Sequence, residues 1–138
     1  MRLSMAAELA VRGILVLAEH NGQGPFALEE ICRQRNLPRQ YLTKIFGQLS
    51  RANLIRAVRG KGGGYVLARP PGDITLLAVI EAVEGPLAVN LCQQTPSCCQ
   101  NSTSCPVQPV WRDLQEKIRQ ALSAHTLNEF TGCTEGPK

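Results

Sequence analysis

Apolar positions in the first part of the chain recur at helical spacing in three consecutive segments. Residues 4–20, 28–34 and 38–52 each place apolar side chains three or four residues apart, which predicts three helices. Ser4 is expected to cap the first helix, and Pro38 to occupy the first position of the third, where its missing N–H costs nothing. The third segment has the clearest apolar stripe and a polar opposite face. The stripe consists of Leu42, Ile45, Phe46 and Leu49.

The pattern then changes to short β-prone runs. Residues 54–58 and 65–68 flank the basic, glycine-rich segment 59–64, which predicts a hairpin with a flexible tip. Further helices are expected over 74–83 and over 107–124, the second with a long apolar seam. The seam consists of Val107, Val110, Trp111, Leu114, Ile118, Ala121 and Leu122. The predicted fold is mainly α with a small β-hairpin wing: a winged helix-turn-helix followed by a long C-terminal helix.

Charge is unevenly distributed along the chain. Residues 1–70 hold eleven Lys/Arg and four Asp/Glu, a net charge of +7, whereas residues 71–138 hold four and seven, a net charge of −3. Such asymmetry indicates that the N-terminal half meets a polyanion. An ordinary solvated basic surface is the alternative interpretation.

A helix, a short turn, a second helix and a basic hairpin suit double-stranded DNA. The helix over 38–52 can enter the major groove, where Gln amides bond adenine and Arg or Lys bonds guanine or phosphate. The hairpin can place a cation in the minor groove or along the backbone. A winged helix that only contacts other proteins is the alternative. The predicted DNA-binding residues are Arg39, Gln40, Tyr41, Thr43, Lys44, Gln48, Arg59 and Lys61.

Four of the six cysteines lie in one uncharged polar stretch ahead of the last helix. They are Cys92, Cys98, Cys99 and Cys105. The stretch has neither a helical nor a strand period, and loops of this length in compact domains are typically functional or disordered. Thiolates bind soft metals, so an iron–sulfur cluster or a zinc ion would order it. Cys32, on the inward face of the second helix, is expected to be a core residue.

The sequence predicts a cytoplasmic protein that is not an enzyme. We recognise no signal peptide, and no apolar run approaches the roughly 20 residues that span a membrane. In the cytoplasm, clustered cysteines indicate metal or redox chemistry more often than structural disulfides. No nucleophile–base set or paired carboxylates lie in a recognisable motif. Segment 60–64 lacks the order of a phosphate-binding loop.

Four segments resemble the Rrf2 family of bacterial transcription regulators. They are Met1–Ser4, Tyr41-Leu42, Val58–Tyr65 and Val110–Leu114, and the Arg-Gly-x-Gly-Gly-Gly-Tyr wing is the most specific of them. The similarity covers about residues 1–130. It implies a homodimer on a palindromic operator, with the long C-terminal helix as the dimerisation element.

The resemblance also implies an organisation of the chain. Residues 1–84 would be the winged helix-turn-helix DNA-binding domain, and residues 85–106 a cysteine-rich, cluster-binding loop. Residues 107–130 would be the dimerisation helix and 131–138 a flexible tail.

Cluster-binding members of the family carry three cysteines in this loop. Cys92 and Cys105 match the outer two. Five residues separate Cys92 from Cys98, and five separate Cys99 from Cys105, so the family spacing cannot be met by both middle cysteines. We favour Cys98 as the middle ligand and keep Cys99 as the alternative.

The fourth ligand departs from one type of family site. In that type a histidine follows the last cysteine by three residues, but this chain has Gln108 there, and an amide is a poor iron ligand. Other members use a carboxylate near the start of the first helix of the partner subunit, and Glu8 matches that position. The alternative for Glu8 is a solvated carboxylate favoured by the helix dipole.

The resemblance thus implies an iron–sulfur cluster, of 2Fe–2S or 4Fe–4S type, that senses redox state, nitric oxide or iron–sulfur supply and switches operator binding. One alternative is the same regulator with a thiol switch or a structural zinc, favoured by the Cys98-Cys99 pair and the missing histidine. Another is a cluster-carrying electron-transfer or assembly protein that never binds DNA, which the basic wing argues against.

Overall fold

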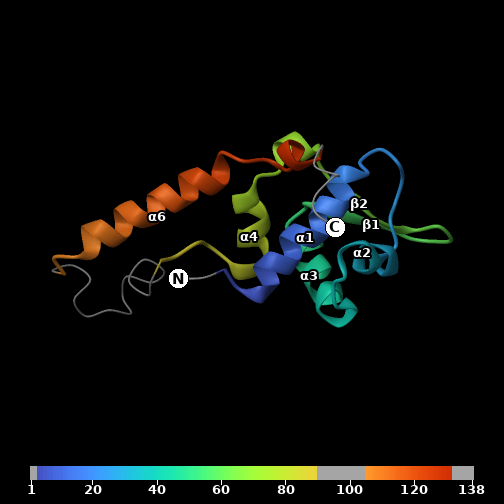
Figure 1. The fold of residues 1–138 in the computed structure, drawn as a ribbon, viewed down its shortest axis with the longest axis horizontal. Coiled ribbons are helices and arrows are strands. Elements are labelled where there is room, and N and C mark those ends of the chain that lie inside the picture. The colour runs from blue at the N-terminus through green and yellow to red at the C-terminus, as the bar shows by residue number, and fades with distance from the viewer. Residues whose placement is uncertain (1–2, 90–104, 132–138) are drawn as a thin grey trace.

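The computed structural model describes residues 3–89 and 105–131 of the 138-residue chain. Within these residues the helices are mostly packed into one body, and two short strands form the hairpin (Figure 1). This confirms the mainly α fold with a β-hairpin wing. The elements are α1 (Met5–Glu19), α2 (Leu28–Arg35), α3 (Arg39–Arg51), β1 (Ile55–Val58), β2 (Gly64–Leu67), the 3-10 helix η1 (Pro71–Asp73), α4 (Leu76–Glu84), α6 (Gln108–Ser123) and the 3-10 helix η3 (Leu127–Phe130).

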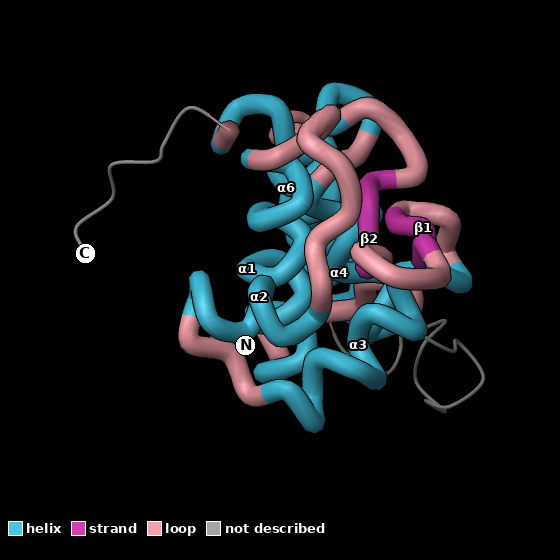
Figure 2. The backbone as a smooth tube through the Cα atoms, turned by 90° about the vertical axis from the view of Figure 1, so that its right-hand side faces the viewer, coloured by secondary structure: helices cyan, strands magenta, loops and turns pink. Residues whose placement is uncertain are grey.

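The body lies between two projecting parts. Figure 1 shows the hairpin tip extending from one side and α6 from the other, with the N-terminal end of α6 furthest from the body. Figure 2, turned by 90°, shows β1 and β2 side by side at one edge of the helices. None of the described helices is both long and apolar enough to span a bilayer.

Local signals fix where α1 and α3 begin. Ser4 caps α1 as predicted, because its Oγ accepts a hydrogen bond from the backbone N–H of Ala7 at 3.1 Å. Pro38 is the N-cap of α3, one position earlier than predicted. Its backbone is extended (ψ 121°) although its carbonyl already accepts the first helical hydrogen bond, from Leu42 N at 3.1 Å. The residue therefore stands outside the helix that it starts.

The core is formed by side chains of α1 to α4, both strands and η3. The predicted stripe of α3 is fully confirmed, since its four members are all buried. Close approach of α1 to α3 depends on Gly13, because a Cβ there would lie 2.8 Å from Cε1 of Phe46. Phe46 also meets the Tyr65 ring edge-on at a centroid distance of 5.0 Å, which joins both helices to the wing.

The C-terminal end of the chain returns to this core, which the sequence pattern did not predict. Thr75 and Thr126 form an antiparallel bridge, in which Leu127 N donates to Ile74 O at 3.0 Å. Leu127 is completely buried. The bridge explains why α4 starts two residues later than expected: Ile74 is extended, and Thr75 caps the helix through its Oγ1 and Ala78 N.

In contrast, α6 has no buried residue in the single chain. Its apolar seam follows the predicted positions, but Val110 is 57% exposed and Leu114 is 38% exposed. Trp111, Ile118 and Leu122 are half-buried, so only part of the seam faces outward.

Replacing Leu127 with alanine is expected to lower the free energy of unfolding by about 2–5 kcal/mol, because it leaves a cavity in the core. Urea unfolding at one fixed protein concentration measures this. Asn128→Ala, an exposed neighbour, should change the value by no more than about 0.5 kcal/mol. Equal midpoints for both variants would show that η3 is not part of the core.

Candidate nucleic-acid interface and cysteine site

The outer face of α3 carries most of the side chains that the sequence predicts to contact DNA. Arg39, Gln40, Thr43 and Lys44 are all exposed. Arg39 reaches back to α2, where its Nη2 lies 2.6 Å from Oε1 of Glu29. Both members of this ion pair are more than half exposed, so the guanidinium can exchange the carboxylate for a phosphate at little cost.

A groove of about 410 Å³ runs along one flank of the same helix. Three predicted DNA-binding residues, Tyr41, Lys44 and Gln48, line it together with apolar side chains of α1 and α4. Gln48 is half-buried there, whereas Gln40 is exposed. Gln40 is therefore the glutamine better placed to read a base edge. The apolar lining residues are Met5, Ala6, Leu9, Ile45 and Val83.

Two further residues of the outer face, Gly47 and Arg51, were not identified from the sequence. Gly47 is half-exposed and Arg51 is exposed in the last turn, where a cation is favoured by the helix dipole. They follow Gln40 by seven and eleven residues, a helical spacing that could have identified them. A glycine inside a helix costs about 1 kcal/mol relative to alanine, so Gly47 weakens α3.

The wing presents its cations at the tip. Arg59 and Lys61 are both exposed between β1 and β2. Gly60 adopts a left-handed backbone (φ 105°), and its carbonyl accepts from Gly63 N at 3.0 Å, which closes the turn. The strands pair antiparallel with Ile55 opposite Leu67. The predicted basic hairpin is therefore present as expected.

The base of the wing is held against the segment before α2. Phe26 N donates to Tyr65 O at 3.1 Å, and Tyr65 N donates to Phe26 O at 2.8 Å. This exchange places the Phe26 carbonyl directly over Gly64, where a Cβ would overlap it. Gly64 is therefore required for the approach of the wing to the helices.

Of the four clustered cysteines, only Cys105 lies within the described residues; Cys92, Cys98 and Cys99 fall in residues 90–104, outside them. Cys105 is a half-buried free cysteine just before α6, and its carbonyl accepts from Gln108 N at 3.2 Å. No group of three or more His, Cys, Asp or Glu that could hold a metal occurs among residues 3–89 and 105–131. The predicted ligand set stays a prediction.

Glu8 is exposed in the first turn of α1. It lines a second groove, of about 320 Å³, together with side chains of α1, α4 and α6. The carboxylate is thus accessible from outside the chain, beside an apolar surface. The other lining residues are Leu3, Val11, Arg12, Leu76, Ile80 and Leu122.

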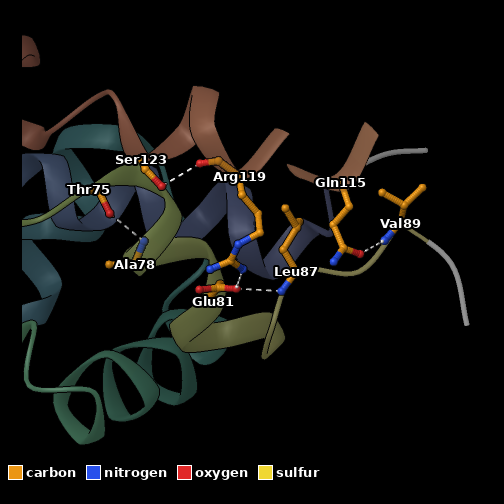
Figure 3. Close-up of polar contacts among 8 residues, drawn as sticks. All are labelled: Thr75, Ala78, Glu81, Leu87, Val89, Gln115, Arg119 and Ser123. Carbon is orange, nitrogen blue, oxygen red and sulfur yellow. Dashed lines mark hydrogen bonds and ion pairs between the residues drawn. The ribbon is translucent and has the colours of Figure 1, made fainter. Parts of the chain in front are cut away.

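A polar clasp fastens the start of the cysteine loop to α4 and α6. Figure 3 shows Glu81 of α4 between Leu87 and Arg119: its Oε2 accepts from Leu87 N at 2.8 Å and from Arg119 Nη1 at 2.7 Å. Gln115 Oε1 also accepts from Val89 N at 3.2 Å. The chain that leads into the cysteines is thereby bonded to α4 through Leu87 and directly to α6 through Val89.

Cys32 behaves as a structural residue. It packs against the core, and burial raises the pKa of its thiol. A thiol with a raised pKa is less often ionised, and therefore a poorer metal ligand or nucleophile. The expectation that Cys32 belongs to the core is met in part, since the residue is half-buried at the edge of the core.

A family model, Rrf2, described as an iron-dependent transcriptional regulator, matches residues 3–132. The chain belongs to the Rrf2 family. The HTH-type transcriptional regulator IscR of Sodalis glossinidius is 36% identical to it over 135 residues, which cover 98% of this chain and 81% of that relative. IscR of Pectobacterium atrosepticum is 34% identical over 135 residues, with coverages of 98% and 82%.

Solved structures of Rrf2 regulators share the fold. CymR (YrzC), the global cysteine regulator of B. subtilis, superposes with a TM-score of 0.80 at 25% identity, covering 98% of this chain and 99% of that one. IscR of T. potens gives 0.78 at 27% identity, with coverages of 100% and 93%. The oxidised form of Staphylococcus aureus CymR gives 0.76 at 28%, with coverages of 99% and 100%.

This Rrf2 protein is therefore a DNA-binding transcription regulator with a winged-helix fold, and it is not an enzyme. The expectation from the four resembling segments is confirmed at this level.

Gly64→Ala is expected to lower the free energy of unfolding by about 2 kcal/mol, because the new methyl group overlaps the Phe26 carbonyl. It should also weaken binding to a duplex selected by the wild type from random sequences, since the wing can no longer pack. Urea unfolding and gel shift measure the two effects. Gly72→Ala, which adds a methyl group in open space, is the matched control. Wild-type values for Gly64→Ala would contradict the close packing.

Proposed function

We propose that the protein is a homodimeric regulator whose operator binding is controlled by an iron–sulfur cluster at the cysteine loop. The observation that carries the proposal is the position of Cys105. It stands just before α6, and the other end of the loop is bonded to Gln115 of the same helix and to Glu81 of α4, which pairs with Arg119 of α6. A change in the loop would therefore act directly on α6.

A second copy of the chain would pack against the exposed part of the apolar seam of α6. A 16-residue helix with no fully buried side chain draws limited stability from its own chain. Two such helices in a two-fold arrangement would cover each other, since a self-complementary surface is how most homodimers form. Leu114 and Val110 would then lie in the interface.

A dimer also accounts for how DNA would be read. Two-fold symmetry would place two α3 helices in successive major grooves, about 34 Å apart, on a palindromic operator. Gln40 and Lys44 would face base edges, and Arg59 and Lys61 of each wing would contact the flanking minor groove or phosphates. These are the exposed polar residues of α3 and the wing tip.

The donor set fits an iron–sulfur cluster. Cysteine thiolates are the usual ligands of such clusters, and Cys105 is a free cysteine that is neither fully buried nor fully exposed. We propose Cys92, Cys98 and Cys105 as the thiolate ligands, with Cys99 as the alternative to Cys98, and Glu8 of the partner subunit as the fourth. When bound, the cluster supplies a redox-active centre that oxygen or nitric oxide can attack.

The residues of the chain then connect the loop to the DNA-binding domain. Glu81 ties the loop to α4, while Glu84, one turn later, accepts from Ser4 N at 2.8 Å through its Oε1. The last turn of α4 thus holds both the entry to the cysteine loop and the start of α1. A shift of the loop would move α6 and α1 together, which changes the spacing of the two α3 helices.

A thiol switch without a cluster is the second candidate. The adjacent Cys98-Cys99 pair and the glutamine at position 108 favour it. Three of the similar structures are CymR proteins, of which one is described as a global cysteine regulator and another was solved in an oxidised form. A structural zinc at the same cysteines would be the metal-bound variant of this candidate.

Anaerobic reconstitution with iron and sulfide should give a brown protein with visible charge-transfer absorption. Simultaneous replacement of Cys92, Cys98 and Cys105 by serine should abolish the colour. Cys32→Ser should leave it intact, because that thiol packs against the core. A colourless product with stoichiometric zinc, or with a reversible disulfide, would support the second candidate and contradict the cluster.

A further inference from the structure

The one glycine inside the described part of α3 has no packing reason to be there. An ideal Cβ built on Gly47 meets only Nη1 of Arg51, at 3.8 Å, which is ordinary van der Waals contact. No other element of the described chain comes within 4 Å of it. A side chain at this position would fit the free protein, and alanine would make the helix more stable.

Gly13 in α1, in contrast, is required by close packing within the chain. A Cβ there would lie 2.8 Å from Cε1 of Phe46 and 3.2 Å from Cδ1 of Leu42. Both atoms belong to buried side chains of α3. The glycine at 13 is therefore explained within the chain, whereas the glycine at 47 is not.

Gly47 lies in the middle of the polar face that α3 turns away from the core. Gln40 precedes it by two turns, Thr43 by one, and Arg51 follows by one, so all four share one line along the helix. The three side chains are exposed. A helix that enters the major groove along this line would bring the Cα of Gly47 nearest to the base edges or phosphates.

We infer that Gly47 is a positioning residue for DNA: it lets the backbone of α3 approach the duplex closely. This rests on the proposed use of α3 as the reading helix. The missing side chain makes the free helix less stable. Its advantage, a closer contact between backbone and DNA, would arise only in the complex. Arg51, with its planar fork of N–H donors, would then contact a phosphate.

The experiment compares Gly47→Ala and Gly47→Gln with the wild type, using full-length protein purified anaerobically. The probe is the duplex that the wild type selects from random sequences, and fluorescence anisotropy gives its Kd. Gly47→Ala should raise Tm by roughly 2–6 °C. It should also raise Kd by about tenfold, the loss expected when one base contact moves out of reach. Gly47→Gln should raise Kd further.

Gly72→Ala is the matched control, since it adds a methyl group in open space outside α3. Its Kd should equal that of the wild type. If Gly47→Ala is stabilised and binds within twofold of the wild type, the inference is overturned.

Gln40→Ala and Lys44→Ala separate this inference from the proposal on which it rests. If both raise Kd by about tenfold while Gly47→Ala does not, only the role of Gly47 fails. If neither changes Kd, the use of α3 as the reading helix fails as well. Weakened binding by all three variants supports both.

Discussion

The attachment of α6 is the constraint on which the account depends, because no side chain of this helix is fully buried in its own chain. The chain holds it mainly at its C-terminal end. There the Thr75–Thr126 bridge and the buried side chain of Leu127 tie the segment after α6 to the core. The Glu81–Arg119 ion pair adds a second contact, which is partly exposed and therefore modest in energy. The N-terminal end of α6 projects away from the body (Figure 1), and Cys105 precedes that end by three residues.

In this arrangement a rigid winged-helix domain is joined to a projecting helix, α6. Gly13 and Phe46 lock α1 against α3, and the Phe46–Tyr65 contact fixes the wing to the same core. The reading surface should therefore move as one unit. Whatever changes the angle of α6 would reposition that unit as a whole, because packed cores shift between arrangements rather than bending continuously. The proposed sensor beside α6 would act on α3 for this reason.

Much of the fold could be predicted from the sequence, since it depends on local patterns. The stripe of α3, the cap at Ser4 and the glycine-rich wing each have a period or a motif. The return of Leu127 to the core, the clasp of Glu81 and the fit of Gly64 under the Phe26 carbonyl join residues far apart in the sequence. No local period signals such contacts, so they were not predicted.

The candidate site was likewise predictable where it follows a local pattern, and not where it depends on contacts between distant residues. Helical spacing identified most of the outward residues of α3, but it did not show that Gln48 is half-buried in a groove formed with α1 and α4. Gly47 was overlooked because a residue without a side chain leaves no mark in a pattern of polar positions. The ligand roles of Cys92, Cys98 and Cys99 stay predictions, since these residues lie outside the described ones.

Native mass spectrometry of the anaerobically purified protein tests the central claim most directly, that a second copy covers α6 and completes the cluster site. The wild type should appear as a dimer that carries iron and sulfide. Leu114→Glu should give a monomer, because it places a charge in the proposed interface, and Glu8→Ala should stay dimeric with a lower cluster content. A wild type that is monomeric, or a Leu114→Glu variant that is dimeric with its full cluster content, would contradict the account.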